Sequence, residues 1–275
     1  APDAARAPYY LGNLFYDKRQ YDLAVEAWEK AAELDPTFPT VWRNLSLAYY
    51  NKQNDADKAL AAIEKAFGLD QTDSRVLMEL DQLYKKLHRP HADRLAFLQK
   101  YPSLVAQRDD LVLEEITLLN MLGRYQEAKE RLDGHIFHPW EGGEGKVPAQ
   151  YQFARVELAR KAIDEGCYDE AITLLMECLE YPHHLGEGKL HGAQENDFHY
   201  WLGMAYNAKG DTAQSQMWLA KAAEGNLEPA AAMYYNDAKP EKIFYQGLAL
   251  KALGRDSEAD SRFHALTSYG EKHHF

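Results

Sequence analysis

Two segments of the chain concentrate side chains that could do chemistry. The first, from His135 to Gln150, reads HIFHPWEGGEGKVPAQ, and the second, from Tyr181 to Tyr200, reads YPHHLGEGKLHGAQENDFHY. Each has histidine close to a proline, followed by the tetrapeptide Gly-Glu-Gly-Lys. Imidazoles are common metal ligands, so a zinc or nickel site is one hypothesis. We predict no metal and no cofactor, because no two of these histidines have the i,i+4 spacing of a helical zinc motif and neither segment contains cysteine.

The Gly-Glu-Gly-Lys segments also suggest two kinds of enzymatic chemistry. A Walker loop follows a strand and has Ser or Thr after its lysine. Val147 and Leu190 occupy that place here. Paired carboxylates can hydrolyse glycosides when their separation is right, but acidic residues in a polar loop are more often simply solvated. We therefore predict that this chain alone is not an enzyme and that the two segments bind rather than react.

The elements that must position these loops repeat along the chain. Residues 11–36 read LGNLFYDKRQYDLAVEAWEKAAELDP. The small residues Gly12 and Ala24 suit a close crossing of two helices, and the large residues Leu11, Phe15 and Trp28 suit the space around it. This pattern resembles the tetratricopeptide repeat (TPR), a helix–turn–helix unit of 34 residues. The resemblance implies that neighbouring units stack to bury a continuous core.

The same spacing returns along nearly the whole chain. Seven units are predicted over residues 5–38, 39–73, 74–108, 109–135, 152–182, 196–225 and 240–270, with insertions at 136–151 and 183–195. The third unit is degenerate, and its second helix should start at Pro90. The predicted fold class is all-α, a single right-handed superhelical solenoid of TPR-like units with two long inter-repeat loops. An ordinary helical bundle is the alternative.

The two insertions form the first candidate binding surface. Because successive repeats stack with a small rotation, loops inserted one repeat apart should emerge on the same edge. We expect Trp140 to pack against the aromatic cluster at 198–201, with the two Gly-Glu-Gly-Lys segments around one polar surface. The proposed loop residues are His138, Trp140, Glu144, Lys146, His184, Glu187, Lys189 and His191.

The TPR resemblance implies a second surface, the groove lined by the first helix of each unit. The proposed groove residues are Arg6, Tyr9, Asn13, Arg43, Asn44, Tyr50, Arg75, Lys85 and Lys86. Their positive charge predicts a preference for acidic peptides. Asn13, Asn44 and Arg75 match positions at which some TPR domains clamp a peptide carboxylate, but Tyr9 and Glu79 stand where that clamp has cationic residues.

Composition excludes several classes of partner. The chain has 31 Lys and Arg against 43 Asp and Glu, a formal charge of −12, which disfavours nucleic acid and anionic membranes. No apolar run approaches the roughly 20 residues of a membrane span. The two cysteines are too few for a disulfide framework. We expect a soluble, cytoplasmic protein.

A narrower resemblance rests on the two loops. The pair HPWEGGEG and YPHHLGEG, set among TPR units, is similar to the C-terminal region of large bacterial proteins that carry a sugar-mutarotase-like β-sandwich upstream. It implies that this chain, which begins at Ala1 without methionine, is a fragment of a longer one. Our main hypothesis is a non-catalytic scaffold that binds a peptide or partner domain, including an N-terminal domain of the same polypeptide. The alternative is an accessory module of a carbohydrate-active protein, with loops that complete or dock onto a sugar-binding catalytic domain.

Overall fold

The computed structural model describes residues 2–230 and 239–273, so Ala1 lies outside the described residues. Throughout these ranges every regular element is helical, which confirms the predicted all-α class of paired helices. The chain forms two compact units that meet in sequence between Leu122 and Gly123. We call them the N-terminal unit and the C-terminal unit and describe each by itself.

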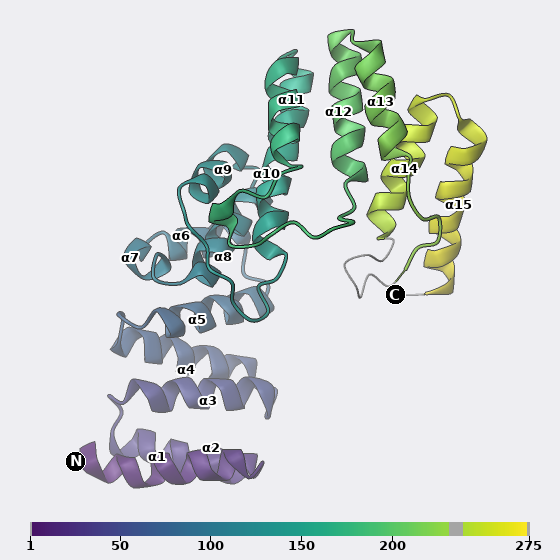
Figure 1. The fold of residues 1–275 in the computed structure, drawn as a ribbon. Coiled ribbons are helices and arrows are strands. Elements are labelled where there is room, and N and C mark those ends of the chain that lie inside the picture. Colours follow the sequence, from purple (N-terminus) through teal and green to yellow (C-terminus); the bar gives the residue numbers. More distant parts are fainter. Residues whose placement is uncertain (1, 231–238, 274–275) are drawn as a thin grey trace. The chain divides into compact units, whose positions relative to one another are not determined.

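The N-terminal unit is built from consecutive helices that pack in pairs (Figure 1). Its helices are α1 (Pro2–Asp17), α2 (Tyr21–Leu34), α3 (Pro39–Asn51), α4 (Ala56–Leu69), α5 (Ser74–Lys86), α6 (His91–Leu98), α7 (Pro102–Val105) and α8 (Asp109–Met121). The pairs α1–α2 and α3–α4 are regular, whereas α6 has only 8 residues and is followed by the short α7. Pro90 is the N-cap of α6, so the predicted start is confirmed to within one residue.

The C-terminal unit continues the paired arrangement. Its elements are α9 (Tyr125–Asp133), α10 (Lys146–Asp164), α11 (Tyr168–Glu177), the 3₁₀ helix η1 (His183–Leu185), α12 (Asn196–Lys209), α13 (Thr212–Ala222), α14 (Pro240–Ala252) and α15 (Asp256–Lys272). The pairs α10–α11, α12–α13 and α14–α15 pack together, and α11 also packs on α12. Helix α10 begins inside the segment predicted to be an insertion. Pro148 does not prevent this, because the first turn of a helix needs no N–H at that position.

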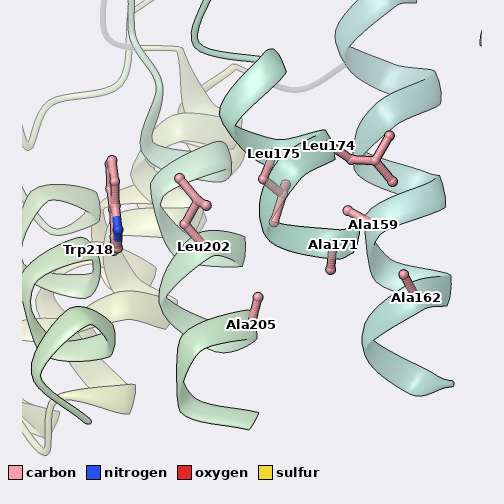
Figure 2. Packing of buried hydrophobic residues seen from close by; sticks show 8 residues of the cluster. All are labelled: Ala159, Ala162, Ala171, Leu174, Leu175, Leu202, Ala205 and Trp218. Atoms are coloured by element: carbon pink, nitrogen blue, oxygen red, sulfur yellow. The ribbon is translucent and has the colours of Figure 1, made fainter. Parts of the chain in front are cut away.

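Small residues let the paired helices approach one another closely. A Cβ atom on Gly12 would lie 2.4 Å from the indole of Trp28, and one on Gly203 would lie 2.6 Å from Leu219. Figure 2 shows the same principle in the core of the C-terminal unit, where the alanines of α10 and α11 leave room for larger side chains. The interpretation of these small residues as sites of helix crossing is confirmed.

The turns between paired helices share a backbone feature. Residues with positive φ follow α1, α3 and α5 at Arg19, Asn54 and His88, and glycines take this conformation after α8, α10, α12 and α14. Glycine adopts positive φ without steric cost, so the later turns satisfy the requirement more easily than the first three.

None of the helices within residues 2–230 and 239–273 combines the length and the apolar character that crossing a lipid bilayer requires.

Candidate functional site

The two long connections of the C-terminal unit pack against one another. We define the first loop as residues 134–145, between α9 and α10, and the second loop as residues 178–195, between α11 and α12 (Figure 1). The backbone N–H of Phe137 donates to the carbonyl of His184 over 2.8 Å. Phe137 and Leu185 are 2% and 1% exposed. Each loop therefore buries one large apolar side chain close to the hydrogen bond that joins the loops.

Gly186 fixes the approach of the second loop to the first. Its φ is +73°, and a Cβ atom there would lie 2.6 Å from the carbonyl oxygen of Phe137. Any other residue would combine an unfavourable backbone conformation with a collision against main-chain atoms, which cannot move aside like a flexible side chain. The contact between the loops thus depends on this glycine.

The two Gly-Glu-Gly-Lys segments lie in direct contact. The backbone N–H of Gly145 donates to Glu187 Oε2 over 2.7 Å. Gly145 is the N-cap of α10, where backbone donors lack partners within the helix and the helix dipole favours negative charge. The carboxylate of the second loop therefore caps the helix that follows the first, and the expected meeting of the two segments on one edge is confirmed.

Two adjoining hollows lie on this edge. We call the larger, of about 590 Å³, the loop cleft; its walls include Glu144, Pro148, Tyr181, Glu187, Leu190, Glu195, Phe198, Lys239 and Lys242. We call the smaller, of about 270 Å³, the Trp140 hollow; it is lined by His138, Pro139, Trp140, Glu141, Gly143, Glu144 and Glu187. Glu144 and Glu187 line both, so the hollows adjoin at these two carboxylates.

Trp140 does not occupy the predicted position. Its ring lies over Gly143, where a Cβ atom would be 2.3 Å from the indole. Two rings of this cluster pack elsewhere: that of His199 lies 5.4 Å from Trp218 and that of Tyr200 lies 5.6 Å from Tyr245 between ring centroids, whereas Phe198 lines the loop cleft. The expected packing of Trp140 on this cluster is wrong, because α12 directs those rings toward α13 and α14, whereas the indole covers a glycine of its own loop.

Two lysines around the loop cleft form ion pairs, and a third, Lys239, also lines the cleft. Lys189 Nζ lies 2.5 Å from Glu195 and donates to the carbonyl of Leu179 over 2.8 Å. Lys242 Nζ donates to Asp197 over 2.6 Å, and both side chains are largely buried. Lys146, in the first turn of α10, is exposed. Lys189 is therefore a brace of the second loop, which the sequence did not reveal.

The predicted histidines do not converge. His138 lines the Trp140 hollow, His184 is half-buried with its ring 6.2 Å from that of Tyr151, and His191 is exposed. Within the described parts of the chain, His, Cys, Asp and Glu nowhere gather in a group of three or more that could hold a metal ion.

The predicted groove residues lie on α1, α3 and α5 of the N-terminal unit. Their cations are paired more fully than the sequence indicates. Arg43 is within 2.5 Å of Glu79, which Arg75 also reaches at 3.2 Å, and Lys85 lies 2.9 Å from Glu114. The hydrogen bonds to Glu79 raise the pKa of Arg43. The positive surplus that motivated a preference for acidic peptides is therefore largely neutralised.

The remaining groove residues mostly contact one another. Asn13 Oδ1 accepts hydrogen bonds from Trp28 Nε1 at 3.0 Å and from Asn44 Nδ2 at 3.3 Å. The ring of Tyr9 lies 5.0 Å from that of Phe38. The ammonium of Lys86 sits 4.8 Å over the ring of Tyr50, and both border a hollow of about 60 Å³. Arg6 is exposed on α1. The amides that resemble a carboxylate clamp are thus partly engaged within the fold.

Sequence analysis missed two buried arginines. Arg94 is 2% exposed, lies 2.6 Å from both Asp81 and Glu114, and joins α5, α6 and α8. Burial would raise the pKa of Glu114, but its bonds to Arg94 and Lys85 keep that pKa below the usual value.

The second arginine plays the same part in the C-terminal unit. Arg155 of α10 is 3% exposed and binds Asp133 at 2.6 Å and Glu177 at 2.7 Å. Both arginines could have been predicted to be buried, because each stands on a helical face that is otherwise apolar.

Comparison with known proteins places these observations in a family context. Residues 12–53 match the family model described as TPR repeat. Among solved structures, a tetratricopeptide repeat protein from Parabacteroides merdae is 16% identical, with 98% of this chain and 94% of that chain covered and a TM-score of 0.45.

Two further structures show comparable likeness. YrrB, a TPR protein with an unusual peptide-binding site, is 20% identical over 72% of this chain and 91% of its own, with a TM-score of 0.46. The TPR2AB domain of yeast Sti1, in complex with an Hsp90 peptide, is 14% identical over 99% and 93%, with a TM-score of 0.41. The comparisons support one assignment, a TPR sequence over residues 12–53 in a chain whose residues 2–230 and 239–273 form paired helices.

Proposed function

We propose that this chain is a non-catalytic scaffold that binds another polypeptide, and that the loop cleft with the Trp140 hollow is its principal binding surface. The observation that carries the proposal is the mutual packing of the two loops, which use Gly186 and the Gly145–Glu187 hydrogen bond to build a cleft. Concave sites with apolar walls and a few placed polar groups are the usual form of binding pockets. The TPR match of residues 12–53 supports a role in protein interaction.

Two potentially reactive side chains, in and beside the second loop, are held in unreactive forms. Burial raises the pKa of the Cys178 thiol to about 12, so the nucleophilic thiolate is not formed near neutral pH. Burial also lowers the pKa of His199 to about 4, and its ring packs on Trp218 instead of lining the cleft. These groups serve the core of the C-terminal unit.

The test is selection from a random peptide library displayed on phage, with the purified chain immobilised. We expect an enriched peptide family that binds the folded chain in solution. We expect Gly186→Ala to weaken this binding and Gly68→Ala, on α4 of the N-terminal unit, to preserve it, because a Cβ atom on Gly68 would meet nothing within 4 Å and Gly68 belongs to neither loop. A library that yields no peptide able to bind the folded chain would overturn the proposed function.

A second candidate, an accessory module of a carbohydrate-active protein, rests on the Trp140 hollow. A half-buried indole beside Glu141 and Glu144 offers an apolar face for a sugar ring and acceptors for its hydroxyl groups. The test is calorimetric titration of the chain with a panel of neutral monosaccharides. Saturable binding that is lost in Trp140→Ala would support this candidate, and absence of binding across the panel would remove it.

A further inference from the structure

The loop cleft and the Trp140 hollow differ in chemistry although they adjoin. The Trp140 hollow is lined by three carboxylates, those of Glu141, Glu144 and Glu187, and its lining includes no lysine or arginine. The loop cleft has a large apolar wall, to which Pro148, Leu190 and Phe198 contribute. A ligand that fits both must present different groups to the two hollows.

The Trp140 hollow favours a cation. An indole face attracts an ammonium or guanidinium group through its quadrupole. Carboxylates add charge-assisted hydrogen bonds, and a guanidinium can engage two oxygens at once. Glu187 Oε2 accepts a hydrogen bond from the backbone N–H of Gly145. This bond keeps the carboxylate of Glu187 in place at the boundary between the two hollows. An anionic group would meet three carboxylates here and is disfavoured.

The loop cleft favours an apolar side chain. Its volume of about 590 Å³ lies within the range of about 300–1,000 Å³ typical of ligand sites. Of its five charged lining residues, Glu195 pairs with Lys189 and Lys242 pairs with Asp197, while Glu144 and Glu187 also line the Trp140 hollow. The fifth, Lys239, makes the cleft a less favourable place than the Trp140 hollow for a second cation. The ammonium of Lys242 also lies 5.0 Å from the centroid of the Phe198 ring. This contact orders both side chains in the cleft wall before a ligand binds.

We propose that the two hollows together recognise a peptide segment in which a lysine or arginine side chain neighbours a large apolar side chain. The cation enters the Trp140 hollow and the apolar group enters the loop cleft. This inference rests on the proposed function and names its partner class. The loops are braced before binding, so they themselves lose little conformational entropy on association.

The experiment uses fluorescein-labelled peptides of glycine and serine with a central Arg-Leu or Arg-x-Leu, titrated against the full chain by fluorescence anisotropy. Three matched peptides replace arginine by citrulline, arginine by glutamate, or leucine by serine. A charge-assisted hydrogen bond exceeds a neutral one by about 1.4 kcal/mol, so citrulline should weaken binding about tenfold. The glutamate and serine peptides should bind more weakly still or not at all.

Variants of the chain provide the complementary test. Glu144→Gln and Trp140→Leu should each weaken the arginine peptide by about tenfold, and circular dichroism should show unchanged helix content, since both residues lie in a loop. Glu26→Gln is the matched control, because Glu26 is an exposed carboxylate on α2. Equal binding of arginine and citrulline peptides, or an unchanged affinity of Glu144→Gln, would overturn the inference.

The outcomes separate this inference from the proposed function. If the library yields binders that do not compete with the Arg-Leu peptide and are insensitive to Glu144→Gln, the scaffold stands and the basic-apolar ligand is wrong. If neither defined nor selected peptides bind, the proposed function itself fails. Binding of a neutral sugar in the Trp140 hollow without any peptide binding would favour the carbohydrate candidate and refute the inference.

Discussion

Replacing Gly186 by alanine removes the backbone feature on which the contact between the two loops depends. In the structure this residue has a φ of +73°, and an added Cβ atom would lie 2.6 Å from the carbonyl oxygen of Phe137. A non-glycine residue in the left-handed conformation costs about 1–2 kcal/mol. Relief of the collision would separate the loops and break the Phe137–His184 hydrogen bond, which contributes about 0.5–1.5 kcal/mol.

The expected total is about 2.5–4.5 kcal/mol when about 1 kcal/mol is allowed for residual crowding. Hydrogen exchange read by mass spectrometry is the appropriate assay, because local opening of the loops is measured without global unfolding. The amide of Phe137 should lose protection by roughly 60- to 2,000-fold in Gly186→Ala. Amides in α12 and α13 should be unchanged.

The matched control is Gly188→Ala, two residues away in the same loop. A Cβ atom there would have nothing within 4 Å, so the variant should exchange like the parent chain. Equal protection of Phe137 in the parent chain and in Gly186→Ala would refute the account of the loops as one braced surface. Equal loss in both variants would show that the loop tolerates no substitution, whatever its packing.

Three further predictions concern the fold. Gly203→Leu should destabilise the C-terminal unit by about 1–3 kcal/mol, because its side chain would overlap Leu219; an unchanged thermal midpoint would contradict the close crossing of α12 and α13. Arg94→Leu should lower the free energy of unfolding in chemical denaturation by about 3–5 kcal/mol, because it leaves Asp81 buried without its cation. The double variant Arg94→Leu, Asp81→Leu should recover part of that loss, and no recovery would refute the pairing. Burial lowers the folded-state pKa of His199 to about 4, so between pH 6.5 and 4 only the unfolded chain binds a proton at this residue. The free energy of unfolding should therefore decrease as the pH falls through this window. A His199→Phe variant whose free energy of unfolding in urea depends on pH as in the parent chain would contradict this.

The features of the sequence that predicted the fold correctly are those governed by local packing. Gly12 and Gly203 indicate helix crossings because only a residue without a side chain fits beside Trp28 or Leu219. The meeting of the two Gly-Glu-Gly-Lys segments was also predictable, since repeats that stack with a small rotation bring equivalent loops to one edge. The predicted end of the first insertion, at residue 151, was wrong, since α10 begins at Lys146 and the sequence pattern of Lys146 to Gln150 alone does not distinguish loop from helix.

What could not be predicted depends on contacts across helices. Glu79 neutralises Arg43 because the offset between α3 and α5 brings them together, and sequence spacing does not determine that offset. The buried position of Arg94 arises in the same way, from the meeting of α5, α6 and α8. The indole of Trp140 packs over Gly143 because the chain bends back within the first loop, and the amino-acid sequence of the loop does not indicate this bend.

The most direct test of the central claim is hydrogen exchange of the full chain with and without a peptide that it binds. If the loop surface is the binding site, the peptide should slow exchange in residues 134–145 and 178–195 and leave α1 to α5 unchanged. This protection should disappear in Glu144→Gln at the same peptide concentration. Protection confined to the first-helix face of the N-terminal unit, with both loops exchanging as in the free chain, would contradict the claim.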